Sequence, residues 1–380
     1  MPNTRHHLWV ASAAALLATA IPSAQATNVR YVVHVSVDGL RPDVIINLGA
    51  LELPNFYRMR TQGTFTDNAR SDYYVTVTLP NHVTQLTGRP VSGADGHQWE
   101  SNSDPAPGAT LHSNKGSYVA GVCDVVHDNG SRTALYASKS KFSLFEVSWD
   151  AIQGAPDTTG ADDGRDKIDR FVLNGNTGTL VNTFFADMQA DPYHYSFIHL
   201  TDPDTVGHSE GWDPTPGSAY SNVIKTMDQR LGRIFDLIDT DARLAGRTAL
   251  IVTADHGGEG SDHSNASLLA NYRVPFYVWG PGVSAGTDLY TINAGRRLDP
   301  GTAKPPYAGS TRPPAPPLQP VRNGDAANLA LDLLGLGPVP GSSINAAQDL
   351  RVPEPATFAL LALGGCAALR RRTACTRRPS

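Results

Sequence analysis

Five short stretches of this 380-residue chain carry carboxylates, imidazoles and one hydroxyl in a combination that suits metal chemistry. Carboxylates and imidazoles are zinc ligands in proteins, and a threonine hydroxyl beside them can act as a nucleophile. Two cations about 3.5–4 Å apart can hold both oxygens of an in-line phosphoryl displacement. The side chains concerned are Asp38, Thr78, Asp204, His208, Asp255, His256 and His263.

The hydroxyl lies in the stretch Thr78-Leu79-Pro80-Asn81-His82. A β-rich run from Tyr73 precedes it, and a short helical pattern that ends at Gly88 follows it. Pro80 suits the first turn of a helix, which places Thr78 at or just before the N-cap. A helix N-terminus offers free N–H groups and favours negative charge. The hydroxyl is therefore either a helix cap or a nucleophile that faces an anionic group.

Taken singly, the other stretches also have simpler interpretations. Asp38 with its following glycine fits a turn, and Asp204 with His208 fits a solvated loop pair. Asp255-His256 fits the cap of a following helix, and His263 fits a surface histidine. Together these residue types are those that a pair of zinc ions requires, which favours one shared site.

The elements that must position these residues alternate between strand and helix patterns. Buried strands are predicted at 31–37, 133–137, 193–200, 248–253 and 274–279, and helices at 42–48, 54–62, 142–152, 179–189, 218–239 and 325–334. This alternation predicts an α/β fold, with a doubly wound, mainly parallel central sheet and helices on both faces. In such sheets the site lies beyond the carboxyl ends of the strands, where Asp38, Asp204 and Asp255 are expected.

Three further segments are predicted to lack regular structure. Residues 89–132 and 154–178 are rich in small and polar residues and are expected to form loops over the site. Residues 302–320 are rich in proline and are expected to form an ordered surface loop. The loops at 89–132 and 154–178 are expected to shape the pocket for the leaving group.

The composition is that of a globular protein, with 40% hydrophobic and 18% charged residues. The formal net charge is −5, so nothing in the charge balance favours nucleic-acid binding. Residues 1–26 have the three regions of a secretory signal peptide: Arg5, an apolar run from Leu8 to Ala20, and small residues up to Ala26. A buried N-terminal helix is the alternative.

The C-terminal segment 351–380 is predicted to be a sorting or anchor tail. Val352-Pro353-Glu354-Pro355 precedes an apolar run over 356–369 and the cluster Arg370-Arg371-Arg372. This arrangement resembles the PEP-CTERM sorting signal of Gram-negative bacteria, which implies processing by an exosortase-like protease; a simple tail anchor is the alternative. Signal peptidase and this sorting machinery are the expected export partners. The expected destination is the periplasm, the cell surface or the medium, with the tail as a transient inner-membrane anchor.

Removal of both ends would make the protein strongly acidic. Residues 1–26 and 356–380 contain six arginines and no acidic residue, so 25 cationic and 36 anionic side chains remain, a net charge of −11. Any anion that the remaining domain, 27–350, binds therefore needs a local cation. Cys123 is the single cysteine left, so no internal disulfide is available.

The motifs, in their order along the chain, resemble the alkaline phosphatase superfamily in its type I phosphodiesterase/nucleotide pyrophosphatase branch. The resemblance covers about 31–336 and is carried by the motifs at 36–39, 78–82, 203–208 and 253–257, followed by His263 and the run 275–281. The cysteine or serine of the sulfatase motif and the Asp-Ser-Ala turn of typical alkaline phosphatases are both absent from the 78–82 stretch.

The resemblance implies a metal-dependent phosphoesterase with two zinc ions and a small phosphorylated substrate. Asp204, His208 and His263 would hold the first zinc, and Asp38, Asp255, His256 and Thr78 the second. Thr78 would attack phosphorus and form a phospho-threonine intermediate. The family also places an asparagine downstream of the nucleophile, which makes Asn102 the candidate donor to a non-bridging oxygen.

Two lysines and the site as a whole leave alternatives open. Lys139 and Lys141 are either solvated lysines or site cations, because a Lys-x-Lys or Lys-x-Arg pair at this place resembles superfamily members that act on phosphonates or phosphate monoesters. A phosphomonoesterase or phosphonate hydrolase is therefore the alternative to a phosphodiesterase. An inactive surface scaffold or binding protein on the same fold is the alternative of another class.

Overall fold

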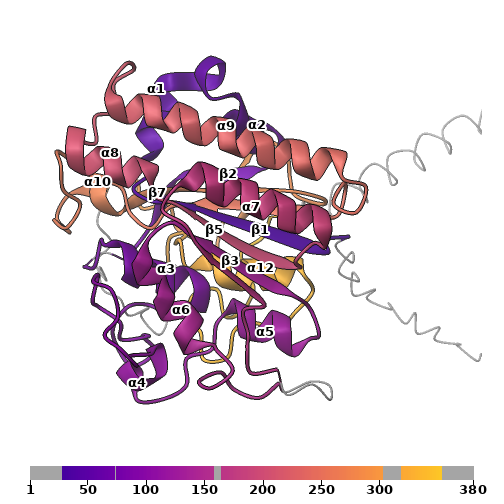
Figure 1. The fold of residues 1–380 in the computed structure, drawn as a ribbon. Helices are drawn as coiled ribbons and strands as arrows, with labels where there is room; N and C mark the ends of the chain where they lie inside the picture. Colours follow the sequence, from indigo (N-terminus) through magenta and orange to yellow (C-terminus); the bar gives the residue numbers. More distant parts are fainter. Residues whose placement is uncertain (1–27, 73, 158–163, 303–317, 353–380) are drawn as a thin grey trace, which may run out of the picture.

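The computed structural model describes residues 28–72, 74–157, 164–302 and 318–352 (Figure 1). The expected signal peptide, the sorting tail after residue 352 and most of the proline-rich loop lie outside these residues. Within the described ranges, no helix combines the length and the apolar character needed to cross a membrane.

One sheet of eight strands forms the centre of the described fold, in the order β4-β3-β5-β1-β6-β7-β2-β8. Its middle strands β3, β5, β1 and β6 run parallel, while β7 runs antiparallel to both β6 and β2. The strands are β1 (Tyr31–Val37), β2 (Thr64–Arg70), β3 (Thr133–Ala137), β4 (Arg170–Leu173), β5 (Tyr195–Leu200), β6 (Thr248–Thr253), β7 (Arg273–Trp279) and β8 (Thr287–Asp288).

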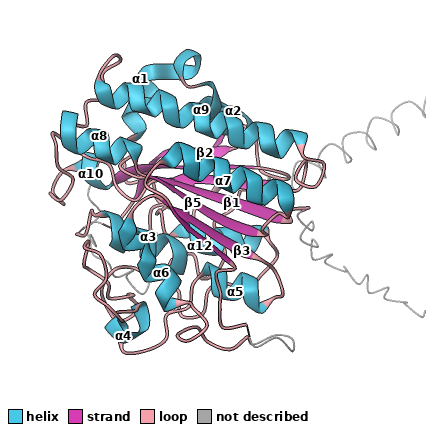
Figure 2. Ribbon diagram, viewed as in Figure 1, coloured by secondary structure: helices cyan, strands magenta, loops and turns pink. Residues whose placement is uncertain are grey.

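Helices cover both faces of this sheet, as the sequence predicted (Figure 2). One layer contains α1, α2, α7, α8 and α9, and the opposite layer contains α3, α5, α6 and α12. The helices are α1 (Pro42–Glu52), α2 (Pro54–Gln62), α3 (Thr78–Thr87), α4 (Leu111–Lys115), α5 (Val122–Asp128), η1 (Ser140–Phe142), α6 (Ser143–Ser148), α7 (Thr177–Ala190), α8 (Asp202–Glu210), α9 (Ala219–Thr240), α10 (Leu269–Tyr272), α11 (Leu289–Ile292) and α12 (Asp325–Leu333).

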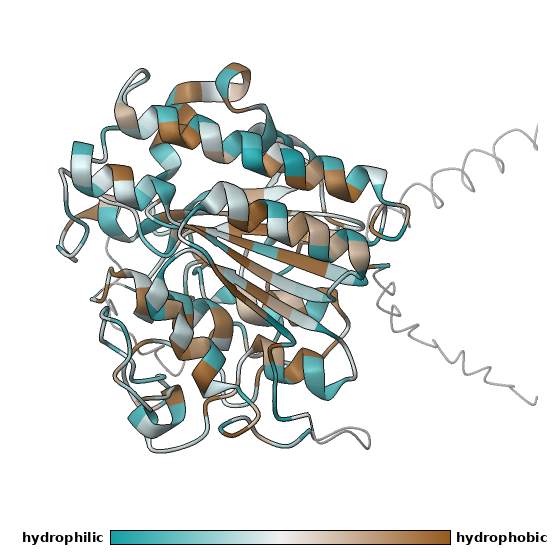
Figure 3. Ribbon diagram, in the orientation of Figure 1, coloured by the Kyte–Doolittle hydropathy of each residue, from teal (hydrophilic) through white to brown (hydrophobic). Residues whose placement is uncertain are grey.

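The core lies between the sheet and its two helix layers. All residues of β5 and β6 are buried, as expected for parallel strands that are covered on both faces. The strands are accordingly the most hydrophobic part of the ribbon, while the long helices alternate in polarity (Figure 3). In α9, Ile224, Leu231 and Ile234 lie on the buried side at helical spacing.

Several local expectations were wrong. Residues 74–77 are not a strand; β2, which the sequence did not indicate, lies earlier in the chain. The segments predicted as loops contain α4, α5 and β4. The unexpected elements β2, α4, α5 and β4 are short, polar or at the sheet edge, where hydrophobic periodicity is weak.

The parallel strands β1, β5 and β6 end side by side and deliver the predicted site residues to one edge. Asp38 directly follows β1, and Asp255 lies two residues after β6. Asp204 and His208 lie one helical turn apart on α8, which follows β5, rather than in a loop. The expected position of the site beyond the carboxyl ends of the strands is therefore where these side chains lie.

Candidate active site

Thr78 is the first residue of α3, and the residue at the N-cap is Val77. The Thr78 side chain makes no capping hydrogen bond, so the helix-cap interpretation is wrong. Its Oγ instead lies 3.3 Å from Nζ of Lys139 and 3.4 Å from Nε2 of His256. Asn81 fixes the helix entrance, because its Nδ2 donates to the carbonyls of Val75 and Val77, at 2.6 Å and 3.0 Å.

A close approach of two chain segments brings Asp38 beside Asp204. Gly39 has φ +72°, a left-handed conformation that favours glycine, and a Cβ there would lie 3.2 Å from Cα of Asp204. The glycine therefore permits α8 to pack directly against the turn after β1. Asp38 and Asp204 are both buried, at 0% and 4% exposure, although carboxylates are almost never buried without a partner.

The three candidate histidines share one arrangement that directs Nε2 into the site, where Nε2 of His208 and Nε2 of His263 lie 3.1 Å apart. Nδ1 of His256 lies 2.8 Å from the carbonyl of Gly257, and Nδ1 of His208 lies 3.1 Å from the carbonyl of Ser261. Nδ1 of His263 lies 2.7 Å from the Thr76 carbonyl. A carbonyl only accepts, so each Nδ1 carries the proton and each Nε2 presents a lone pair. This is how ligating histidines are commonly oriented.

Three carboxylate oxygens face these lone pairs and have no hydrogen-bond partner among the described residues. They are Oδ1 of Asp38, Oδ1 of Asp204 and Oδ2 of Asp255, and all three are buried. Uncompensated buried oxygens are costly, and a bound cation is a common explanation. Ligand atoms of two groups lie within 4.8 Å of one another: Asp204, His256 and His263, and Asp38, Asp255 and His256.

The protonation states also suit a metal. Burial lowers the pKa of His256 to about 4 and that of His263 to about 3, so both rings are neutral at pH 7. Neutral imidazole is the form that binds metals. Burial and the Asp38 charge raise the pKa of Asp204 and hold that of Asp255 well above its ordinary value. A divalent cation would relieve this repulsion between carboxylates.

Lys139 lies between the two carboxylate groups. Its Nζ is 2.6 Å from Oδ2 of Asp38 and 2.7 Å from Oδ2 of Asp204. Burial acts to raise the pKa of Asp38, but the Lys139 ammonium and a hydrogen bond from His199 outweigh it and hold that pKa well below its ordinary value. The solvated-surface interpretation of Lys139 is therefore wrong.

Asn102 and Lys141 reach the same edge from two further segments. Oδ1 of Asn102 accepts from the backbone N–H of Leu79 at 2.9 Å and from Nζ of Lys141 at 3.2 Å. Both acceptor contacts orient the Asn102 amide and place it beside the residue that follows Thr78. The structure thus brings together all ten side chains that the sequence singled out, while their individual roles stay predictions.

The sequence did not single out two buried histidines that lie behind the site. His199 lies 2.9 Å from Oδ2 of Asp38. His82 lies 2.8 Å from the Thr78 carbonyl through Nδ1 and 2.9 Å from Oγ of Ser36 through Nε2. The one available signal was the position of His199 near the carboxyl end of a predicted buried strand.

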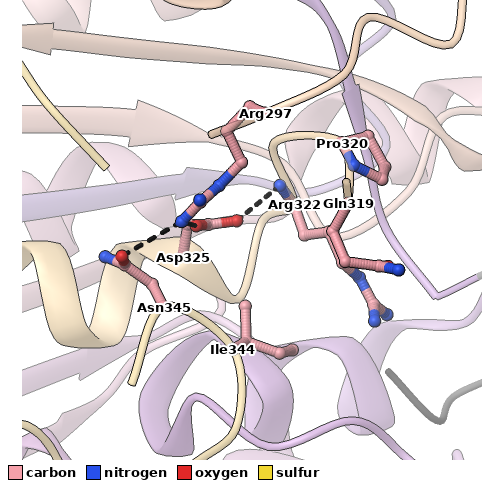
Figure 4. A pocket seen from close by; sticks show the side chains of 7 residues that line it. All are labelled: Arg297, Gln319, Pro320, Arg322, Asp325, Ile344 and Asn345. Atoms are coloured by element: carbon pink, nitrogen blue, oxygen red, sulfur yellow. Dashed lines mark hydrogen bonds and ion pairs between the residues drawn. The ribbon is translucent and has the colours of Figure 1, made fainter. Parts of the chain in front are cut away.

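A small cavity elsewhere contains none of the predicted site residues (Figure 4). Arg297 donates to Oδ1 of Asp325 and to Oδ1 of Asn345, both at 3.1 Å. Oδ2 of Asp325 accepts from the backbone N–H of Arg322 at 2.7 Å. These contacts hold the start of α12 against the preceding segment, so we interpret this network as structural.

The fold and the candidate metal ligands define an alkaline phosphatase-like α/β protein. A similar fold is found in murine ectonucleotide pyrophosphatase/phosphodiesterase 5, solved as an inactive threonine-to-alanine variant in complex with AMP. The TM-score is 0.55 at 16% identity, and the match covers 84% of this chain and 99% of that chain. An alkaline phosphatase superfamily protein of Vibrio parahaemolyticus also has a similar fold, with a TM-score of 0.52 and 14% identity. The match covers 85% of this chain and 72% of that chain.

The family follows from the sequence profile of the type I phosphodiesterase/nucleotide pyrophosphatase family. That profile matches residues 32–93 and 112–274, which is more than half of the chain. The protein belongs to this family. A PEP-CTERM protein-sorting motif matches residues 351–372, so the chain also ends in a sorting signal of the predicted kind.

Curated relatives match over a shorter stretch. GPI ethanolamine phosphate transferase 1 of Neurospora crassa is 39% identical over 88 residues, which are 23% of this chain and 8% of that protein. The same transferase of Gibberella zeae is 40% identical over 127 residues, 32% of this chain and 11% of that protein. The match thus spans about a tenth of these relatives.

The position of His263 leads to the first testable prediction. We expect His263→Ala to release one metal ion, or to weaken its binding, while the fold persists, because one Nε2 ligand is lost from the Asp204 group. Zinc per chain, measured after dialysis against increasing chelator, is the readout. His194→Ala serves as the control, because His194 lies at the opposite end of β5. Zinc content unchanged at high chelator concentration would exclude His263 from the site.

Proposed function

We propose that this protein is an exported two-zinc phosphoric ester hydrolase that works through a phospho-threonine intermediate at Thr78. The observation that carries the proposal is that three histidine Nε2 atoms lie close to three unpartnered carboxylate oxygens, with the Thr78 hydroxyl 3.4 Å from one of them, Nε2 of His256. Such a set of donors fits zinc, which accepts nitrogen and oxygen ligands.

The residues divide into two groups of ligands. Asp204, His208 and His263 would hold one zinc, and Asp38, Asp255, His256 and Thr78 the other. His256 lies close to both groups, since its Nε2 is 3.4 Å from Oδ1 of Asp38 and 3.9 Å from Oδ1 of Asp204. When bound, the two ions supply Lewis-acid charge that lowers the pKa of a coordinated hydroxyl and stabilises the leaving oxygen.

The chain's own residues then carry out two successive displacements. The Thr78 hydroxyl gives its proton to solvent and its Oγ attacks phosphorus, while the bond from phosphorus to the leaving oxygen breaks and that oxygen takes up a proton from solvent. Water next attacks the phospho-threonine, which releases phosphate or a phosphate ester and regenerates the hydroxyl. The Asn102 amide, held by Leu79 and Lys141, would donate to a non-bridging oxygen through its Nδ2.

The expected substrate is a small phosphorylated molecule, with diesters and pyrophosphates as the first candidates. The family name points to these bonds, and one solved relative is described in complex with AMP. The curated relatives are named as ethanolamine phosphate transferases, which also act at a phosphoric ester. A covalent phospho-enzyme is common to hydrolysis and transfer, because water or an alcohol can accept the phosphoryl group.

The two lysines favour a second candidate, a phosphomonoesterase or phosphonate hydrolase. A monoester dianion carries more charge than a diester, and an ammonium near its free oxygens would stabilise the excess. Lys139 contacts the Thr78 hydroxyl, and Lys141 lies beside Asn102 and has no acidic hydrogen-bond partner among the described residues. Lys141 is thus the lysine whose charge is more available to substrate.

We expect Lys139→Ala and Lys141→Ala to reduce turnover of monoesters or phosphonates much more than turnover of diesters. The measurement is kcat/KM for a matched panel of phosphomonoesters, diesters, pyrophosphates and phosphonates. Lys225→Ala is the control, since Lys225 pairs with Glu52 on α1, away from the site. Equal losses on both substrate classes, or none, would favour the plain phosphodiesterase.

The same panel, combined with metal analysis, separates the enzyme from an inactive scaffold. An active enzyme should contain about two zinc ions per purified chain and hydrolyse at least one substrate class. A scaffold on the same fold would hold no zinc and hydrolyse none. We further propose that the protein functions in the periplasm, at the cell surface or in the medium, after signal peptidase and an exosortase-like protease have acted on its ends.

A further inference from the structure

A buried histidine stands directly behind one of the proposed metal ligands. His199 lies near the end of β5, opposite Ser36 of the neighbouring strand β1. Its side chain is fully buried, and its Nε2 lies 2.9 Å from Oδ2 of Asp38. His199 belongs to β5, and α8 begins only at Asp202. Neither candidate metal group among the described residues includes His199.

The contacts of the other ring nitrogen fix the tautomer of His199. The backbone N–H of Ser138 points at Nδ1 from 3.3 Å, and a backbone N–H can only donate. Nδ1 therefore accepts and carries no proton. In the neutral ring the proton then lies on Nε2, so that His199 donates a hydrogen bond to Asp38.

Two aromatic neighbours prevent the ring from turning away. The Phe142 ring stacks on His199 with centroids 4.3 Å apart and an interplanar angle of 29°. The His82 ring meets it edge-on at 4.8 Å and 88°. Both neighbours are fully buried, and close packing of this kind holds a side chain in one rotamer.

The hydrogen bond determines which oxygen Asp38 presents to the site. Oδ2 is occupied by His199 on one side and by the Lys139 ammonium, 2.6 Å away, on the other. Oδ1 has no hydrogen-bond partner among the described residues and lies 3.4 Å from Nε2 of His256. Rotation of the carboxylate would break both contacts to Oδ2, so the oxygen without a partner stays directed at the candidate metal group.

We propose that His199 is a positioning residue that holds Asp38 in the orientation required for metal binding. This inference rests on the proposed metal centre. Partners of metal ligands commonly change metal affinity about 10- to 100-fold when they are removed. The second metal group, which contains Asp38, should be affected more than the Asp204 group, because among the described residues His199 is hydrogen-bonded to Asp38 and not to Asp204, His208 or His263.

The test compares zinc affinity in variants with and without an N–H donor at this place. His199→Phe keeps an aromatic ring between Phe142 and His82 but removes the donor, whereas His199→Gln can return an amide N–H to Asp38. Competition with graded chelator on the full chain should show one zinc held about 10- to 100-fold more weakly in His199→Phe. We expect His199→Gln to recover most of that loss.

Two controls separate positioning from general damage to the core. The buried histidine His34, which pairs with Tyr195 at 3.0 Å, offers a matched variant, and His34→Phe should leave zinc affinity unchanged. The melting temperature of each metal-free variant reports folding. Should His199→Phe fail to fold, His199→Asn is the substitute variant without a donor to Asp38. The asparagine side chain is shorter than that of histidine, so its amide should reach Ser138 but not Asp38.

The outcomes distinguish this inference from the proposed function. A wild-type protein that binds no zinc would overturn both. Wild-type zinc affinity in a folded variant without the donor would overturn the positioning role and leave the proposed function intact. Equal weakening by His199→Phe and His199→Gln would also overturn it, because packing rather than the hydrogen bond would then hold Asp38.

Discussion

Thr78→Ala is expected to lower turnover by a factor of about 10³ or more while the protein keeps its metal. The Thr78 hydroxyl, on the first residue of α3, is the nucleophile in the proposed mechanism, and alanine cannot form the covalent intermediate. Asp38, Asp255 and His256 would still hold the second zinc, so metal content should remain near wild type. The readouts are kcat for the best substrate of the panel and zinc per chain.

Two comparisons make the Thr78 experiment decisive. Thr87→Ala removes a hydroxyl from the far end of the same helix, about 13 Å along its axis, where Oγ donates to the Val83 carbonyl at 2.7 Å. That variant should keep near wild-type turnover. Trapping of a phosphorylated chain after rapid acid quench should succeed with wild type and fail with Thr78→Ala. Wild-type activity in Thr78→Ala would exclude a phospho-threonine.

Removal of metal is expected to abolish turnover, and zinc is expected to restore it. The effect should exceed that of any single ligand substitution, because both the hydroxyl and the leaving oxygen lose the stabilising charge. Chelation should also lower the melting temperature, since the unpartnered oxygens of Asp38, Asp204 and Asp255 would then face one another. Activity and melting temperature are measured before chelation, after it, and after addition of zinc, magnesium or calcium.

The choice of added metal tests the donor set. Histidine nitrogens favour zinc and other transition metals, whereas magnesium and calcium favour oxygen ligands. Recovery with zinc but not with magnesium or calcium supports the proposed centre. Full activity in protein shown to be free of metal would contradict it.

The sequence predicted the central layers of the fold well. The bounds of β1, β6 and α2 agree with the predicted ranges, because a β-branched run or a proline at the first turn marks each of them. The mainly parallel α/β architecture with helices on both faces is confirmed. Residue type and spacing were sufficient wherever burial on two faces dictates a continuous apolar run.

Features decided by long-range contacts could not be predicted. The antiparallel direction of β7 depends on its pairing with β2 and β6, and no pattern within one strand encodes direction. The position of Thr78 at the first helical residue depends on Asn81, whose side chain contacts the preceding loop. His199 needed the register between β5 and β1 before its contact with Asp38 could be known.

The ligands of the proposed centre come from segments that are distant along the chain, so zinc bound there would be part of the folding equilibrium. Asp38 is the first ligand of the set in the sequence and His263 the last, and five strands of the central sheet, β2 to β6, lie between them. No fragment that lacks either end contains the full set of ligands. A ligand that binds only the native state, present at 100 times its Kd, adds about 2.7 kcal/mol to the free energy of unfolding.

A chain that crosses a membrane before it folds would therefore carry no assembled zinc centre with it. It would take up zinc at its destination, as the sheet closes and brings the turns after β1, β5 and β6 together. Zinc supply outside the cytoplasm would then set both the amount of active protein and the lifetime of the folded chain against proteolysis.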